Sequence, residues 1–349
     1  METTATFCTI VPPHILDRLA QSEDPAVHGP ARRTLERDSL FRTQRRISAV
    51  RGASAPDGTP SGRPLRTIYD AAQQDSLPGT KVHAESDQPA EDQAVNQVRA
   101  WLGATFDFYL KAYGRHSIDD CGLSLNATVH FGDGYGNAFW NGEQMVLGDG
   151  MGEVFLGFTH DLDVVAHELT HGVTQYTADL DYHGQSGALN ESVSDVFASL
   201  IKQYALGQSA DRADWLIGAG LFGPAIHGEA LRSLKAPGTA YDDPRLGKDP
   251  QPATMDDYVR TSRDNGGVHI NSGIPNHAFY LAAGALGGNA WERAGRIWYA
   301  TLTGGELATD ADFADFARLT AATARSLFGD GDEIQAVLKA WSMVGVPTE

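Results

Sequence analysis

The sequence contains little cysteine and no long apolar run. Its 349 residues include two cysteines, Cys8 and Cys121, and neither has a nearby partner of the CxxC type. Two cysteines so far apart do not make a disulfide framework. No apolar stretch approaches the roughly 18 residues that a membrane span requires. We therefore expect core packing or bound metal to hold the fold together, and we expect no membrane span.

Positive charge is also scarce. The formal net charge is −18 at pH 7, which argues against nucleic acid as a partner because phosphates repel an acidic surface. Residues 1–50 carry seven arginines, no lysine and six acids, a net of +1, so the remaining residues carry −19. An Arg-rich arm before an acidic body suits an intramolecular partner, although a solvated helix face can have the same composition.

An ordinary secretory leader is missing from the N-terminus. The stretch Met1-Glu2-Thr3-Thr4-Ala5 has no positive n-region, and no long apolar h-region follows it. We predict secretion by a route that does not use such a leader, with retention in the cytoplasm as the alternative.

The length and the 42% content of hydrophobic residues indicate a soluble globular protein of about two domains. A stretch rich in Gly, Pro and Ser follows residue 50, so we expect a partly helical N-terminal segment at 1–50 and a linker to about 65. The pattern predicts an α+β lobe at 66–175 and a mainly helical lobe at 176–349. The expected helices are 32–46, 90–113, 164–177, 188–204, 276–286, 290–303, 310–328 and 332–344, and the expected strands are 127–131 and 144–147.

The most informative feature is an HExxH motif, His167-Glu168-Leu169-Thr170-His171, followed after nineteen residues by Glu191. Positions four apart lie on one face of a helix, so both imidazoles can reach one ion beside Glu168. Two nitrogens and one carboxylate leave a fourth tetrahedral position open, which is typical of catalytic zinc. We therefore predict one Zn²⁺ ion, with the motif helix at the floor of a cleft between the lobes.

Two further motifs accompany this pattern. Asp195 lies one helical turn after Glu191, and Asp264-Asn-Gly-Gly-Val-His269 follows later. With these motifs the chain resembles, from about residue 66 to its C-terminus, the thermolysin-like zinc metallopeptidases, and within them the protealysin group. The nineteen-residue gap favours their endopeptidases, because aminopeptidases with the same motif usually have a gap one residue shorter.

The resemblance implies a role for each matching residue. The implied zinc ligands are His167, His171 and Glu191, with Glu168 as general base and His269 and Tyr182 as donors to the oxyanion. Asp195 and Asp264 are implied to orient histidines. Substrate contacts are implied for Asn137 and Ala138 on an edge strand and for Arg232. A pocket for the residue after the scissile bond is implied for Phe155, Phe158, Val164 and Leu231.

These residues predict a zinc endopeptidase that uses zinc-activated water and Glu168 to cleave peptides or proteins, before bulky apolar residues. A zinc exopeptidase is one alternative, although no acidic cluster for gripping a free amino terminus is evident. An inactive homologue that binds peptides is another, although Glu168, the three ligands and His269 are all present.

The N-terminal segment resembles a short protealysin-type propeptide through Val11-Pro12-Pro13-His14-Ile15-Leu16. A rigid Pro-Pro segment with apolar side chains can fill a hydrophobic cleft. We therefore expect an autoinhibited precursor with residues 11–16 in its own cleft and a mature form starting near residues 45–55. An ordinary structural N-terminus remains the alternative. Whether Cys8 caps the zinc stays open at this point.

Thermolysin itself carries a double calcium site near its cleft, and the chain departs from that pattern. Asp163 matches one ligand, but Lys202, Leu216 and Ala219 stand where other ligands are expected. Calcium requires six to eight oxygen ligands, which an ammonium group does not supply. We predict that the double calcium site is absent and that Lys202 pairs with Asp163 in its place.

Overall fold

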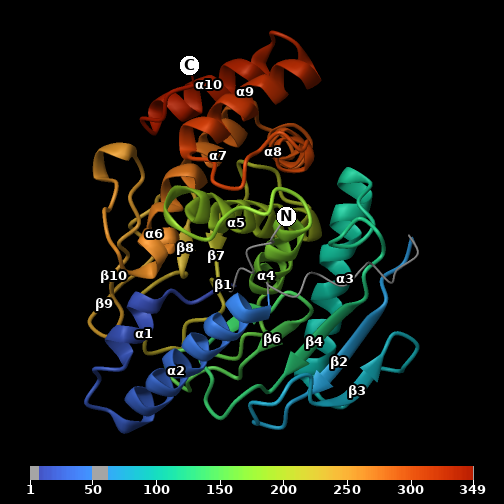
Figure 1. Cartoon of the computed structure of the whole chain (residues 1–349), viewed down its shortest axis with the longest axis vertical. Helices are drawn as coiled ribbons and strands as arrows, with labels where there is room; N and C mark the ends of the chain where they lie inside the picture. Colours follow the sequence, from blue (N-terminus) through green and yellow to red (C-terminus); the bar gives the residue numbers. More distant parts are fainter. Residues whose placement is uncertain (1–7, 49–61, 349) are drawn as a thin grey trace.

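A computed structural model describes residues 8–48 and 62–348, with side chains for 8–41 and 62–348. A six-stranded sheet forms the lower part of the molecule in Figure 1, two central helices cross its middle, and a group of helices forms the upper part. This arrangement confirms the α+β fold of two lobes that the sequence predicts.

The sheet has the order β1-β5-β6-β4-β2-β3. Its strands β2, β4 and β6 run parallel to one another, and the remaining pairs are antiparallel. The strands are β1 (Cys8–Thr9), β2 (Arg66–Asp70), β3 (Thr80–Ala84), β4 (Leu125–Val129), β5 (Ala138–Trp140) and β6 (Met145–Leu147). The N-terminal strand β1 therefore extends the sheet beyond β5.

Helix α3 (Gln93–Tyr113) packs against β2 and β4. The Asp92 carboxylate accepts a hydrogen bond from Ala94 N at 2.7 Å, which caps the first turn. Gly114 ends the helix with φ of 73°, in the left-handed region that favours glycine. Its apolar side chains Val95, Val98, Leu102 and Phe106 are buried.

The central helices are α4 (Leu162–Gln175) and α5 (Gly184–Leu206), which pack directly against each other. Every residue of α4 from Leu162 to Thr174 is buried, because the helix lies between the sheet and the rest of the helical lobe. The motif helix is therefore surrounded by protein on all sides. Polar side chains there must find partners within the protein.

The helical lobe contains α6 (Asp264–Asn271), α7 (Gly273–Leu286), α8 (Ala294–Thr303), α9 (Phe313–Phe328) and α10 (Asp332–Met343). Trp298 and Trp341 stack at its centre with ring centroids 6.1 Å apart. Short antiparallel pairs precede it, formed by β7 (Leu216–Ile217) with β8 (Arg232–Ser233) and by β9 (Asp242–Asp243) with β10 (Gly247–Lys248). A 3₁₀ helix, η2 (Met255–Asp257), leads into this lobe.

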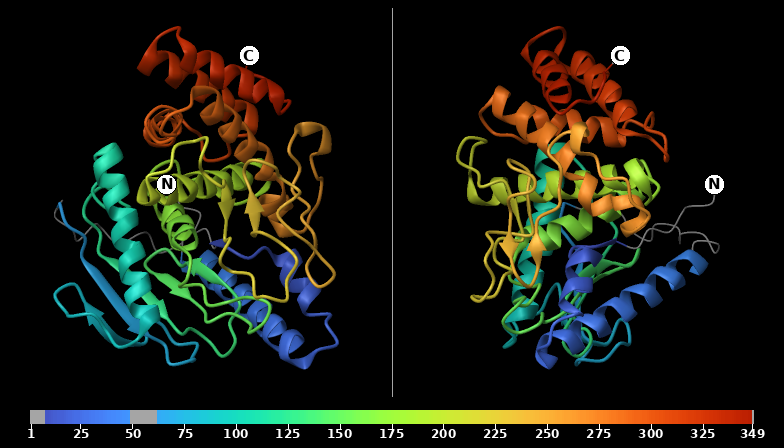
Figure 2. Two further views of the ribbon diagram at one scale, coloured as in Figure 1. Left: turned by 180° about the vertical axis from the view of Figure 1, so that it is seen from behind. Right: turned by 90° about the vertical axis from the view of Figure 1, so that its left-hand side faces the viewer.

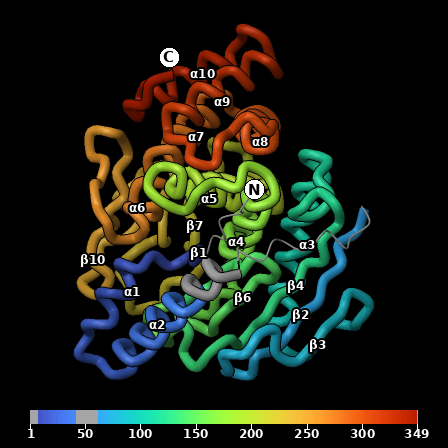
Figure 3. Tube along the Cα trace, viewed as in Figure 1, coloured from blue at the N-terminus to red at the C-terminus, as the bar shows by residue number. Residues whose placement is uncertain are grey.

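The N-terminal segment continues from β1 into α1 (Pro13–Leu19) and α2 (Pro25–Ser48), and Figure 3 draws α1 and the first part of α2 in blue. Pro13 opens α1, where its fixed φ suits the first turn. Arg18 Nη2 donates to Pro244 O at 3.4 Å, beside β9 and β10. Arg33 Nη2 lies 3.3 Å from an Asp133 carboxylate oxygen. The two helices thus contact residues of both lobes, and Figure 2 shows their position from other sides.

Within the described residues, no helix combines the length and the apolar character needed to cross a membrane.

Candidate active site

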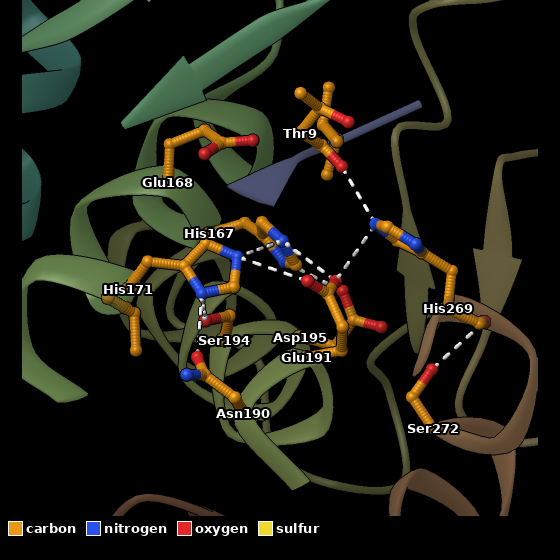
Figure 4. A network of polar contacts seen from close by, with 12 residues as sticks. Thr9, His167, Glu168, His171, Asn190, Glu191, Ser194, Asp195, His269 and Ser272 are labelled. Atoms are coloured by element: carbon orange, nitrogen blue, oxygen red, sulfur yellow. Dashed lines mark hydrogen bonds and ion pairs between the residues drawn. The ribbon is translucent and has the colours of Figure 1, made fainter. Parts of the chain in front are cut away.

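The three side chains predicted to bind zinc converge between α4 and α5 (Figure 4). His167 Nε2 lies 3.0 Å from His171 Nε2 and 3.4 Å from Glu191 Oε2, and His171 Nε2 lies 3.5 Å from Glu191 Oε1. Ligand atoms about 2.0–2.1 Å from a tetrahedral zinc ion stand roughly 3.3 Å apart, so these spacings suit one ion. Glu191 Oε2 is buried and has no hydrogen-bond donor among the described residues. The residues present therefore fit zinc.

Oxygen acceptors orient both imidazoles. His171 Nδ1 lies 2.8 Å from Asn190 Oδ1 and 3.1 Å from Ser194 Oγ, and His167 Nδ1 lies 2.8 Å from Asp195 Oδ1. We assign the proton to Nδ1 in each ring from these partners, which leaves the Nε2 lone pair free for a metal. Burial opposes protonation of His167, but the neighbouring carboxylates raise its pKa to about 9.

The carboxylate of Glu168 lies on the side of the motif helix that faces the sheet. Trp140 N in β5 donates to its Oε2 at 3.0 Å. Its Oε1 is buried and has no partner within the described part of the chain. Burial raises the pKa of Glu168 to about 8. A carboxylate with a pKa near neutrality can both accept a proton and return it, as a general base must.

Asp264 and His269 meet through a tight turn at the start of α6. Asp264 Oδ1 lies 2.7 Å from His269 Nδ1, and its Oδ2 accepts the His269 backbone N–H at 2.9 Å. Gly266 and Gly267 between them have φ of 88° and 82°, in the left-handed region that favours glycine. The Asn-Gly-Gly sequence thus lets the chain turn so that Asp264 faces the histidine.

His269 carries positive charge and Tyr182 lies beside it. Burial opposes that charge, but Asp264 and Glu191 raise the pKa of His269 to about 9, so its Nε2 is protonated at neutral pH. Tyr182 Oη donates to Glu191 Oε1 and lies 3.3 Å from His269 Nε2. Both predicted oxyanion donors therefore lie beside the ligand carboxylate.

Arg232 connects the zinc site with the N-terminal segment. Its Nε and Nη2 form a bidentate pair with Asp195 at 2.8 and 2.9 Å, and its Nη1 donates to Ile10 O at 2.9 Å. Asn276 Nδ2 also donates to Asp195, at 2.9 Å. Burial alone would raise the pKa of Asp195, but Arg232 and His167 lower it to about 2. Asp195 therefore stays ionised beside His167.

The N-terminal segment lies along β5, the strand predicted to bind substrate. After the antiparallel pairing of β1 with β5, Ile10 N donates to Ala138 O at 3.2 Å. Asn137 then contacts both polar groups of one residue: its Oδ1 accepts Val11 N at 2.9 Å and its Nδ2 donates to Val11 O at 3.3 Å. Both edge-strand residues predicted from the sequence thus contact this segment.

Two carbonyl groups of the same segment reach His269, predicted to be catalytic, and Arg232, predicted to contact substrate. Thr9 O accepts a hydrogen bond from His269 Nε2 at 2.9 Å, as Figure 4 shows, and Ile10 O accepts from Arg232. The contacts begin at β1, upstream of the predicted residues 11–16. The reason is backbone pairing with β5, which a side-chain pattern does not reveal.

The residues predicted to line the apolar pocket are all buried. Phe155 and Phe158 have ring centroids 6.0 Å apart, and Val164 and Leu231 belong to the same hydrophobic cluster. That cluster also contains the buried apolar side chains of the N-terminal segment, namely Ile10, Val11, Ile15, Leu16 and Leu19.

Lys202 lies where the resemblance predicts calcium ligands in thermolysin. Its Nζ lies 2.8 Å from Asp163 Oδ2 and 3.1 Å from Asp214 Oδ1, and it donates to Leu216 O at 2.7 Å. Asp163 Oδ1 also accepts Gly218 N at 3.2 Å. Burial would lower the pKa of Lys202, but Asp163 and Asp214 raise it. The ammonium group is therefore charged and surrounded by oxygen atoms.

Three site residues were not predicted from the sequence. Asn190 and Ser194 flank Glu191 on α5 and contact His171; their four-residue spacing on a helix face is a signal that could have identified them. Asn276 contacts Asp195 across 81 sequence positions. No local pattern points to it.

Comparisons with known proteins agree with this geometry. The profile of the thermolysin metallopeptidase catalytic domain matches residues 55–175, and that of the thermolysin metallopeptidase alpha-helical domain matches residues 178–346. An extracellular metalloprotease of Pectobacterium carotovorum subsp. carotovorum is 51% identical over 341 residues, covering 97% of this chain and 96% of that protein. Thermolysin of Alicyclobacillus acidocaldarius subsp. acidocaldarius is 38% identical over 292 residues, covering 80% of this chain and 50% of that protein.

Among solved structures, the precursor of protealysin, a metalloproteinase from Serratia proteamaculans, is 50% identical with a TM-score of 0.87. The alignment covers 97% of this chain and 100% of that one. The chain therefore belongs to the thermolysin metallopeptidase family, as a thermolysin-like enzyme of the protealysin type.

Proposed function

We propose that this chain is the precursor of a zinc endopeptidase whose own N-terminal segment occupies the cleft. The observation that carries the proposal is the path of residues 8–11 along β5 and past His269. The chain continues on both sides of this segment. A cleft that accepts the middle of a chain suits an endopeptidase, whereas an exopeptidase must close one side around a terminus.

The side chains have the roles that peptide hydrolysis requires. When bound by His167, His171 and Glu191, zinc lowers the pKa of a water molecule and polarises a carbonyl group. Glu168 accepts the proton of that water and returns it to the leaving amine. Protonated His269 donates to the oxyanion, at the position where its Nε2 now reaches Thr9 O.

The position of the N-terminal segment along β5 also supports a substrate specificity. If Thr9 O takes the place of the scissile carbonyl, Ile10 takes the place of the residue after the bond. Its side chain is fully buried in the cluster that includes Phe155 and Leu231. This supports cleavage before bulky apolar residues. Digestion of a peptide library tests it, and predominant cleavage before charged residues would contradict it.

The test of endopeptidase activity uses matured enzyme and peptides blocked at both ends. We expect internal cleavage that is lost with a chelator and restored by zinc. Glu168→Gln should lower kcat by roughly 10²- to 10⁴-fold while zinc stays bound, because a general base contributes about that much. Cleavage only of peptides with a free terminus would favour an exopeptidase. Zinc-independent peptide binding without turnover would favour an inactive homologue.

We also propose that Lys202 replaces the double calcium site and that the protein is secreted. The first proposal is supported by the contacts of Lys202 with Asp163, Asp214 and Leu216. The second is supported by relatives named as extracellular proteases. Fractionation of cells that produce the chain tests secretion, and recovery of all activity inside the cells would favour cytoplasmic retention.

A further inference from the structure

We propose that Cys8 is the fourth zinc ligand of the precursor, so that its thiolate takes the position that water needs for catalysis. The inference rests on the proposed zinc site and adds a regulatory residue to it. It assigns a role to a cysteine that the catalytic mechanism does not use.

The first observation is the position of the thiol. Cys8, His171 and Glu191 offer ligand atoms that lie within 4.8 Å of one another, and all three residues are buried. Pairing of Cys8 with Trp140 in the antiparallel register holds β1 at this depth. The hydrogen bond of the next residue, Thr9, to His269 fixes the same register from the other lobe. The sulfur is therefore held beside the ligands by backbone contacts.

The second observation is the set of atoms predicted to bind zinc, of which His171 and Glu191 offer atoms within 4.8 Å of the sulfur. Asn190 and Asp195 assign the protons of His171 and His167 to Nδ1, so two Nε2 lone pairs face each other across 3.0 Å. Both Nε2 atoms can therefore bind one ion once no proton lies between them. Glu191 Oε2, fully buried, has no hydrogen-bond donor in the described residues. These atoms point to a cation and supply three of its four ligands.

Sulfur suits the remaining position chemically. Zinc binds cysteine thiolate well, and a site filled by four protein ligands is closed to water. The thiol releases its proton to solvent when it binds, as metal-bound cysteines do. One thiolate and the Glu191 carboxylate together balance the charge of Zn²⁺.

This arrangement explains why the precursor can hold a peptide in the position of a substrate. The Thr9–Ile10 bond lies where His269 and Arg232 would hold a substrate. Such a bond should be hydrolysed if a nucleophile were available. With Cys8 on the metal, the water that Glu168 would deprotonate has no place. Withdrawal of β1 from β5 removes the sulfur and opens the site in one step.

The test is X-ray absorption spectroscopy of the zinc-loaded precursor. We expect one sulfur ligand at about 2.3 Å in the wild-type protein, and loss of that sulfur in Cys8→Ser. Cys121→Ser is the matched control, since Cys121 is the chain's other cysteine and lies outside this site; it should retain the sulfur ligand. A zinc shell of nitrogen and oxygen alone in the wild-type protein would overturn the inference.

A second measurement covers the case in which Cys8→Ser does not fold. The cobalt-substituted wild-type precursor should show the near-ultraviolet charge-transfer band of a thiolate ligand, and removal of the N-terminal segment should abolish it. A band that persists in the matured protein would count against Cys8. A precursor that binds no zinc at all would instead refute the proposed function. Zinc bound by nitrogen and oxygen alone would leave that function intact.

Discussion

At the scale of single residues, the site is determined by which carboxylate holds which imidazole. Asp195 lies at 2.8 Å from His167, and Asp264 lies at 2.7 Å from His269. Asp195 is on α5 and Asp264 is in the turn that opens α6, and each pairs with a histidine of the candidate site. Such partners fix the tautomer and the direction of the ring. Small changes in them should therefore alter metal binding and catalysis without touching a ligand.

Replacement of Asp195 by Asn tests whether this carboxylate supports metal binding by His167. The change removes the charge that pairs with His167 and Arg232, so zinc affinity should fall by roughly 10- to 100-fold. Competition with a zinc-binding dye measures it. Asp211→Asn is the control because Asp211 is exposed; its zinc affinity should match that of the wild-type protein. Equal affinity in both variants would show that Asp195 does not support the ligand.

A pH prediction concerns His14 in the N-terminal segment. Its Nε2 lies 3.0 Å from Tyr241 Oη, and Asp264, His269 and Arg232 act on it electrostatically. Burial lowers the pKa of His14 to about 4 from 6.5. A pKa that is lowered in the docked state means that docking is fully favourable above pH 6.5. Docking then weakens as the pH falls from 6.5 towards 4, because the undocked histidine binds a proton first.

The measurement is binding of a fluorescent active-site inhibitor to the precursor between about pH 7.5 and about pH 4.5. This range extends from above the pKa of free histidine to just above the lowered pKa of His14. The wild-type precursor should bind more inhibitor at the acidic end. His14→Phe should lose most of this pH dependence, whereas His28→Gln, a change at a half-exposed position of α2, should keep it. Identical profiles for all three proteins would contradict the prediction.

At the scale of elements, the contact between α4 and α5 holds the catalytic groups together. The helix pair supplies the HExxH motif from one side and Glu191 with Asp195 from the other. Lys202 on α5 joins Asp163 on α4 at the far end of this contact. A charged pair in a buried position is costly to break because one charge is left without its partner.

Lys202→Met should therefore destabilise the protein by about 3–5 kcal/mol, the usual cost of removing one partner of a buried pair. Urea unfolding measures the change. Lys248→Met is the control because Lys248 is exposed, and it should change little. If the double variant Lys202→Met/Asp163→Asn regains part of the lost stability, the unpaired Asp163 carboxylate is the cause of the destabilisation. A saturable rise in Tm of the wild-type protein with calcium would contradict replacement of the double calcium site.

At the scale of the whole molecule, residues 1–50 carry a net charge of +1 and the remaining residues carry −19, and the described part of the N-terminal segment contacts acidic residues of the rest of the chain. Specific pairs join them: Arg33 faces Asp133, and Arg37 Nε lies 2.7 Å from Asp75 Oδ1. The Asp38 carboxylate, in the same helix, accepts from Tyr135 Oη and Asn137 Nδ2. Ion pairs and buried hydrogen bonds thus hold α2 on the rest of the chain, and the pairing of β1 with β5 holds the same segment at its start.

Arg37→Glu should loosen α2 and speed conversion of the precursor, because a new acid would face Asp75. Arg32→Glu changes the charge equally at an exposed position of the same helix, so it controls for net charge. Mass spectrometry of the products over time measures conversion and shows whether the mature chain begins near residues 45–55. Equal conversion rates for both variants would show that the Arg37 pair does not retain the segment.

Much of the fold was predictable because its helices have strong local patterns. The helix expected at 90–113 is α3, which begins only at Gln93, and the helix expected at 332–344 is α10. Short strands such as β1 and β7 have two residues each, too few for a periodic pattern. The non-helical turn in α6 was likewise not predicted, because it depends on left-handed glycines rather than on periodicity.

The sequence by itself predicted the ligand set, because HExxH and the Glu191–Asp195 pair each lie within one helix, where spacing dictates direction. Only the tertiary structure decided which segment lies along β5 and reaches His269. The contact of Arg232 with Ile10 joins residues 222 positions apart, and that of His269 with Thr9 joins residues 260 positions apart. Contacts of this range follow from how the lobes and the sheet edge pack. Local sequence spacing therefore cannot predict them.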